Sequence, residues 1–354
     1  MRRDMLSRGG GAYNVGVRIG FVVKSVCIFV GAVVGAGFAT GREIIVFFGD
    51  LGILSPVLAG VLMGAFAGLF IAAGKTVARL GKDGSIAATA ARGGFCCVNV
   101  VGVAATVLIF ATMTAGLEQL LARLTGVEHL GVAAALAAVA LAGKDLRGVG
   151  AVNLILVPAL AAMILYLAAK SEQTGESLPV AIYPSVSYCA MNMLLGGVLV
   201  SKDAEEASAA EICCISAASG CVMAALLAGV YVVSMGYADF AMPLFEFCRD
   251  IGAGFVGAAI AITAILTTLV GAAKTLRDGF AKMLGSGVSA SCAVAMLALA
   301  SSKLDFASAV DSFYPLIGAA ASAVVIGIIP VFVASMLSVR RPSIHSVNLF
   351  RRRR

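Results

Sequence analysis

The sequence is dominated by long apolar segments separated by short polar ones. Most of these segments approach or exceed the roughly 20 apolar residues that a helix needs to cross a bilayer. They are too long for strands and too continuously apolar for amphipathic surface helices. The pattern therefore predicts an all-α polytopic membrane protein with ten transmembrane helices. The predicted spans lie near 17–48, 51–73, 97–121, 130–142, 149–169, 180–200, 212–236, 252–273, 287–301 and 313–338.

The spacing of the spans also predicts an internal repeat. The fourth and ninth spans are the two short ones, opened by Gly131 and Val288, and they occupy corresponding places in two groups of five. Because five is odd, the second group must enter the membrane in the opposite direction, which gives the inverted repeat of many secondary transporters. We expect a first repeat at 1–169, a second at 180–338, and a basic cytoplasmic tail at 339–354.

The charged residues support this topology. Only 13% of the chain is charged, against 60% hydrophobic, and the net charge is +7. If both termini are cytoplasmic, the outer loops hold only four basic residues, and nearly all others lie in inner segments, as the positive-inside rule requires. The charge thus indicates membrane topology, with anionic lipids at the basic termini, and not nucleic-acid binding. The four outer residues are Arg123, Lys170, Arg249 and Lys303.

The stretch VVGAGFATGREI, residues 33–44, is unusual for a transmembrane helix. Gly35, Gly37 and Gly41 favour a break near the middle of the membrane, where free carbonyls of one half-helix and free amides of the next can bind ions or polar groups. The alternative is close helix packing, because Gly31 and Gly35, like Gly37 and Gly41, have G-x-x-x-G spacing.

A charged pair follows these glycines and favours the functional interpretation. Arg42 and Glu43 would each cost about 3 kcal/mol at the centre of a transmembrane helix. We therefore expect them near the outer interface, in a gate or a buried ion pair. Glu118, near the outer end of the third span, is a second acidic candidate for proton transfer, although a residue so close to an interface commonly just reaches water.

Two motifs make a family resemblance visible. GAGFATGREI resembles the signature of the YkvI-type bacterial membrane proteins, and Ser185–Val200 resembles their sixth span, with Tyr188 and Asn192 at matching places. Through them the chain is similar to the amino acid-polyamine-organocation superfamily. That resemblance implies a LeuT-like fold of five plus five helices, discontinuous helices 1 and 6, and a place in the bacterial cell membrane.

The resemblance also implies a sodium site. In sodium-coupled members, Na⁺ lies between the break of span one and an A-x-x-[ST]-[ST] element of span eight, which here is Ala264–Thr268. Hydroxyl and carbonyl oxygens suit a hard cation. Alternatively, the two threonines bond only to their own helix. Phe38 replaces the asparagine of a second sodium site, so only one sodium is expected. The implied ligands are Gly31, Val34, Ala264, Thr267 and Thr268.

For the solute, the resemblance implies that the amides of Ala36 and Gly37 hold a carboxylate. Thr40, Tyr188 and Asn192 are the polar side chains expected nearby, although each alone is equally explained by an interhelical hydrogen bond. The sequence thus favours a secondary active transporter that moves an amino acid or a related small solute with Na⁺, without an organic cofactor. The alternatives are proton coupling through Glu43 or Glu118, and a sensor that binds a ligand without moving it. An enzyme is least supported, because no catalytic constellation converges in the spans.

Overall fold

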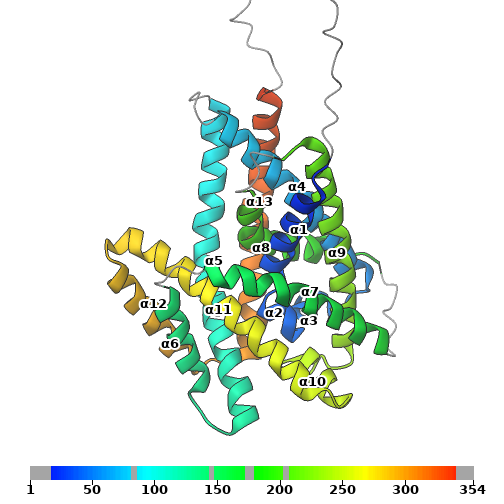
Figure 1. The fold of residues 1–354 in the computed structure, drawn as a ribbon, viewed down its shortest axis with the longest axis vertical. Helices are drawn as coiled ribbons and strands as arrows, with labels where there is room; N and C mark the ends of the chain where they lie inside the picture. Colours follow the sequence, from blue (N-terminus) through cyan, green and yellow to red (C-terminus); the bar gives the residue numbers. More distant parts are fainter. Residues whose placement is uncertain (1–16, 81–85, 143–146, 172–178, 202–206, 340–354) are drawn as a thin grey trace, which may run out of the picture.

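The computed structural model describes residues 17–80, 86–142, 147–171, 179–201 and 207–339, and these residues form helices and no strands (Figure 1). The helices are α1 (Ile19–Val33), α2 (Ala36–Thr40), α3 (Arg42–Phe48), α4 (Leu54–Leu80), α5 (Ile86–Thr125), α6 (Leu130–Ala142), α7 (Arg147–Lys170), α8 (Ile182–Ser201), α9 (Ala209–Met235), α10 (Pro243–Asp250), α11 (Gly254–Leu284), α12 (Gly287–Ser301) and α13 (Phe306–Val339). The predicted tail beyond Val339 lies outside the described residues.

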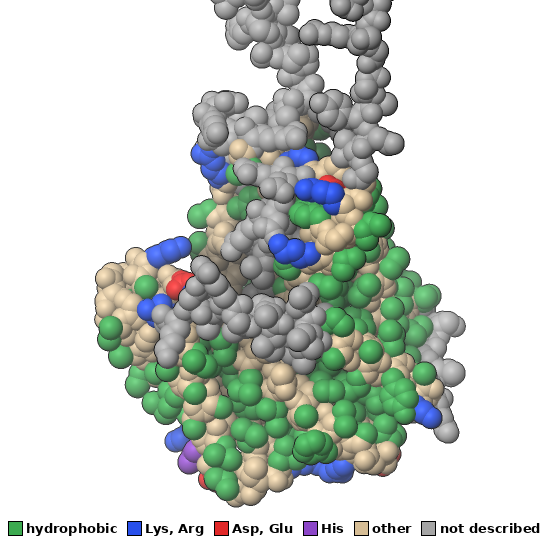
Figure 2. Space-filling model, viewed as in Figure 1, with side chains coloured by type: hydrophobic (Ala, Val, Ile, Leu, Met, Phe, Trp, Pro, Cys, Tyr) green, Lys and Arg blue, Asp and Glu red, His purple; other side chains and the backbone are tan. Residues whose placement is uncertain are grey.

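Every predicted apolar segment contains helix, and the chain is an all-helical, multi-pass membrane protein. Among the described residues, five helices are long and apolar enough to cross a membrane, by length and composition: α4, α5, α9, α11 and α13. The first and last described helices begin and end at the same end of the molecule, here called the terminal end (Figure 1). Figure 2 shows hydrophobic side chains over most of the visible face between the two ends, which suits a lipid-facing surface.

Close packing of α4 on α9 depends on glycine. Gly60, Gly64 and Gly68 are spaced every four residues along one side of α4. A Cβ on Gly60 would collide with the backbone of Ala224, and one on Gly64 with the backbone of Ser216 and Gly220. The Ser216 hydroxyl donates to the carbonyl of Gly64 at 2.7 Å. Small residues allow this approach, which is a common way for helices to associate in membranes.

Helices at corresponding places in the two predicted halves pack on each other. α1 of the first span contacts α8 of the sixth, α4 contacts α9, α5 contacts α11, and α6 contacts α12. The short α6 packs on both α5 and α11, and the short α12 also packs on both. The short helix of each half therefore packs both on the third span of its own half and on the corresponding span of the other half.

One prediction about the sixth span is wrong. α8 runs without interruption from Ile182 to Ser201, although a break was expected there. Its paired glycines lie inside the helix and serve packing: a Cβ on Gly197 would lie 2.8 Å from the ring of Phe70, and one on Gly196 3.3 Å from Val33. The space that a break needs is therefore filled by side chains of α1 and α4. The structure also adds α10, within a segment expected to be a loop.

Candidate functional site

The first span is broken, as predicted, but at two places. α1 ends at Val33, and Val34 and Gly35 leave the helical conformation before α2 begins. A second interruption follows at Gly41, whose φ of 78° lies in the left-handed region that favours glycine. α3 then continues the span to Phe48. The chain between Val33 and Arg42 thus departs from a continuous helix within the apolar segment.

Neighbouring helices pack against both interruptions. A Cβ on Gly35 would lie 3.0 Å from Oγ1 of Thr268 on α11, so the first break packs directly on the helix of the predicted ion site. A Cβ on Gly41 would collide with Oγ of Ser234 on α9. Broken backbone inside a membrane protein is tolerated only where protein, ligand or water replaces the lost hydrogen bonds. The break therefore has a defined partner in α11.

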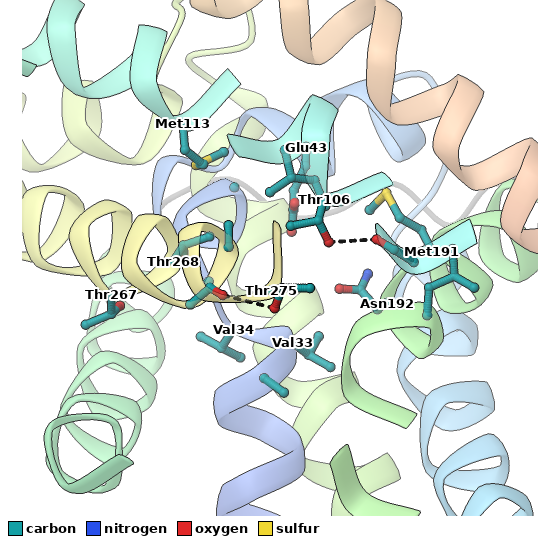
Figure 3. Close-up of a pocket in the computed structure, with 18 of the residues that line it drawn as sticks. Val33, Val34, Glu43, Thr106, Met113, Met191, Asn192, Thr267, Thr268 and Thr275 are labelled. Carbon is teal, nitrogen blue, oxygen red and sulfur yellow. Dashed lines mark hydrogen bonds between the residues drawn. The ribbon is translucent and has the colours of Figure 1, made fainter. Parts of the chain in front are cut away.

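A cavity of about 460 Å³ lies beside the break. Its walls come from the broken span, α5, α8, α11 and α13, and Figure 3 shows side chains from the first four of these around one space. The volume is within the usual range for small-molecule sites. The polar lining residues include Glu43, Asn99, Thr106, Asn192, Thr267, Thr268, Thr275 and Tyr314.

The structure brings most of the predicted ion ligands to this cavity. Gly31 and Val34 line it from the broken span, and Thr267 and Thr268 line it from α11. Ala264 is buried behind them, and its carbonyl accepts a hydrogen bond from the Thr267 hydroxyl at 3.0 Å. That bond is the one expected from the simpler interpretation of the threonines. The structure thus places four of the five residues on one cavity, while their role as ligands stays a prediction.

Glu43 lies deeper in the protein than expected. It is 5% exposed, lines the cavity, and accepts a hydrogen bond from the Tyr188 hydroxyl at 2.7 Å. The ring of Tyr188 makes T-shaped contacts with those of Phe47 and Phe48, with ring centroids 5.2 and 5.4 Å apart. The glutamate of the broken span is thereby fixed to α8 at the cavity wall.

The predicted solute-binding residues divide into two groups. Gly37 and Asn192 line the cavity. The Asn192 amide donates to the carbonyl of Tyr188 at 3.0 Å, one turn earlier in α8, and Tyr188 is buried behind the wall. Thr40 is fully buried, donates to the carbonyl of Gly37 at 2.9 Å, and is not a lining residue. Ala36 begins α2, so its amide lies at a half-helix start, as expected.

Arg42 follows the second interruption of the first span and bonds to two other parts of the protein. Its guanidinium forms two hydrogen bonds with Asp311 of α13, at 2.8 and 2.5 Å. It also donates to the carbonyl of Ala238 at 2.8 Å and to that of Phe240 at 3.4 Å. This fork geometry is the strong form of the arginine-carboxylate pair. Arg42 thus joins the broken span to α13 and to the α9–α10 connection.

Glu118 has a structural partner that accounts for its position. Its carboxylate accepts hydrogen bonds from the backbone amides of His129 and Val132, at the start of α6. Free amides and the positive end of the helix dipole stabilise a carboxylate there. Glu118 is also absent from the residues lining the cavity. The structure therefore shows Glu118 as a cap of α6, and the proton relay stays a prediction.

A second cavity of about 760 Å³ adjoins the first toward the terminal end. The two share Asn99, Val103 and Thr275 in their walls. The second is lined by charged residues as well, including Arg92, Asp278 and Lys282. Together the two cavities connect the broken span with the terminal end, while the Arg42–Asp311 pair lies on the opposite side.

Sequence analysis missed several residues of this site. Tyr314 and Asp311 lie one turn apart on α13, and their polarity in an otherwise apolar span was the available signal. Asn99 and Thr106 of α5 line the cavity and bond to carbonyls of their own helix. Such residues are hard to distinguish from satisfied polar residues without knowing which face of the helix meets the break.

No protein-family model matches the chain, and no curated protein matches it. Among solved structures, the chain is similar to the crystal structure of MhsT in complex with L-phenylalanine. The two share 16% sequence identity with a TM-score of 0.49, over 90% of this chain and 95% of that chain. The resemblance to the YkvI-type proteins stays a prediction.

Proposed function

We propose that this protein is a secondary active transporter that moves a small organic solute, an amino acid or a related amine, together with Na⁺. The observation that supports this best is the contact between the break at Val34–Gly35 and Thr268 of α11, on the wall of a cavity among the helices. Interrupted helices inside a membrane protein typically mark a binding site for substrate and coupling ion.

The donor chemistry of this wall fits sodium. Main-chain carbonyls of the broken span and two adjacent hydroxyls provide oxygen atoms, which hard cations prefer. Gly31, Val34, Thr267 and Thr268 are the lining residues that would hold the ion, with Ala264 directly behind Thr267. Coupling follows if ion and solute stabilise the same arrangement of α1, α2 and α11, because each then favours binding of the other.

The arrangement of the helices supports alternating access in a five-plus-five inverted repeat. Corresponding helices of the two predicted halves pack on each other. The short fourth and ninth spans, α6 and α12, each contact both α5 and α11. In the present state the second cavity extends the site toward the terminal end, and the Arg42–Asp311 pair lies on the other side. We infer a conformation open toward the cytoplasm, since the basic segments predict that the terminal end is cytoplasmic.

Uptake into proteoliposomes tests this function. Purified protein is reconstituted, and radiolabelled amino acids and amines are offered with an inward sodium gradient, with sodium on both sides, or with choline in its place. We expect uptake of at least one solute only with the inward sodium gradient. Binding of solutes without uptake or counterflow in any gradient would instead favour a sensor.

Proton coupling is the second candidate, and the burial of Glu43 at the cavity supports it. A carboxylate in such a place can take up and release a proton as the solute site opens to either side. Uptake driven by a pH gradient in sodium-free buffer would select this mechanism over the sodium-coupled one.

A further inference from the structure

The carboxylate of Glu43 is a cavity group that the proposed sodium site does not use. Among the described residues that line the cavity, it is the only charged side chain. The Tyr188 hydroxyl donates to Oε1, and Oε2 lies against Gly37, whose backbone also lines the cavity. A Cβ built on Gly37 would lie 3.3 Å from the Tyr314 hydroxyl. A second tyrosine therefore lies near Gly37, on the same side as the Glu43 carboxylate. The carboxylate thus borders open volume on one side.

Within the described part of the chain, no cationic side chain pairs with Glu43. Arg42, its neighbour in sequence, is paired with Asp311 instead. The ion pairs of the described residues join other groups and leave Glu43 out. A buried carboxylate without a positive partner is strongly disfavoured. A positive partner is therefore expected to enter the cavity with the ligand.

Charge balance in the cavity restricts the net charge of the solute. The proposed ion adds one positive charge to the cavity and ionised Glu43 adds one negative charge, so a solute of zero net charge leaves the filled cavity neutral. In a low-dielectric site, a neutral filling is favoured over a net charge. A zwitterion satisfies both demands, because its ammonium group pairs with Glu43 and its carboxylate balances the sodium ion.

The rest of the wall indicates the side chain of the solute. Ile109 and Met113 of α5 and Met191 of α8 line the same cavity as Glu43, and Figure 3 shows both methionines on its wall. Methionine is flexible and packs against apolar groups of differing shape. The cavity volume of about 460 Å³ leaves room for an amino acid with a medium-sized apolar side chain.

We propose that Glu43 binds the ammonium group of a zwitterionic amino acid with an apolar side chain; this rests on the transport function proposed above. Tyr188 is then a positioning residue, since its hydroxyl holds Oε1 and leaves the carboxylate to the solute. The proposal assigns to Glu43 a role in solute recognition in place of proton transfer.

Thermal stabilisation of the purified full chain in sodium buffer tests this assignment. The probes are apolar L-amino acids, each compared with its N-acetyl derivative, which lacks the ammonium group, and with the corresponding amine, which lacks the carboxylate. We expect stabilisation by at least one amino acid and none by its two derivatives. In Glu43→Gln, the affinity for that amino acid should fall about tenfold to a hundredfold, the effect of losing one charge-assisted hydrogen bond.

A single cooperative unfolding transition shows that Glu43→Gln is folded, and binding of radioactive sodium to the wild type shows separately that the ion site exists. The inference is overturned if the N-acetyl derivative binds like its parent, if no probe binds, or if Glu43→Gln keeps full affinity for the amino acid. Unchanged sodium-driven uptake in Glu43→Gln with altered pH dependence would make Glu43 a proton carrier. Failure of the transport function is recognised separately, by a wild type that neither binds sodium nor moves any solute.

Discussion

The carboxylate of Glu43 packs against the backbone of Gly37, six residues earlier in the same broken span. Gly37→Ala places a methyl group where Oε2 of Glu43 lies, so Glu43 must move or the span must shift. We expect sodium-driven uptake to fall at least about tenfold, because a group misplaced by even 1 Å weakens a polar contact strongly. Gly271→Ala is the matched control: Gly271 lines the same cavity, and a Cβ there meets nothing within 4 Å. Equal uptake in both variants would contradict the placement of Glu43.

The Arg42–Asp311 pair is expected to control opening on the side away from the terminal end. Asp311→Asn removes the charge but leaves Arg42 its bonds to the carbonyls of Ala238 and Phe240, so we expect a partial loss of uptake. Arg42→Ala removes both sets of bonds and should reduce uptake further. The double variant should resemble Arg42→Ala alone, because the two side chains act as a pair. Additive losses would show that they act independently.

A control for that experiment lies at the same end of the molecule. The Tyr237 hydroxyl donates to Asp250 at 2.6 Å, in an exposed bond between the α9–α10 connection and the end of α10. This bond raises the pKa of Tyr237 to about 12. Asp250→Asn should leave uptake within about twofold of the wild type, since exposed pairs contribute little.

Glycine packing between α4 and α9 should determine much of the stability. Gly64→Ala forces a methyl group into the backbone of α9, and overpacking of this kind costs about 1–3 kcal/mol. We expect a lower thermal unfolding midpoint in detergent. Gly327→Ala on α13 is the control, because a Cβ there meets nothing within 4 Å. If Gly64→Ala has the same unfolding midpoint as the control, the close packing of α4 on α9 does not contribute to stability.

Glu118 should affect stability and leave coupling unchanged. Glu118→Ala deprives the His129 and Val132 amides of their acceptor, and loss of a helix cap costs about 0.5–2 kcal/mol. We therefore expect a lower unfolding midpoint, with sodium and pH dependence of uptake as in the wild type. Abolished pH dependence in Glu118→Gln, a variant that keeps an acceptor oxygen, would restore Glu118 as a proton carrier.

The sequence was sufficient for features that depend on composition along one segment. The bounds of α6 and α12 match the short apolar runs, and the glycine cluster of the first span predicts its interruption. Contacts that depend on which faces of two helices meet could not be predicted from the sequence. The family resemblance implied a break in the sixth span, but Gly196 and Gly197 pack against α1 and α4, and α8 continues. The bond from Tyr188 to Glu43 likewise depends on helix rotation, which apolar periodicity does not determine when all faces are apolar.

Equilibrium binding of radioactive sodium to the purified protein tests the central claim most directly, because it needs no knowledge of the solute. Thr267→Val and Thr268→Val replace each hydroxyl by a methyl group of similar size, and Thr275→Val does the same in the same cavity, at a hydroxyl bonded to the Gly271 carbonyl. We predict saturable binding in the wild type and in Thr275→Val, and its loss in Thr267→Val and Thr268→Val. Equal sodium binding by all four proteins, or saturable binding by none, would contradict an ion held between the broken first span and α11.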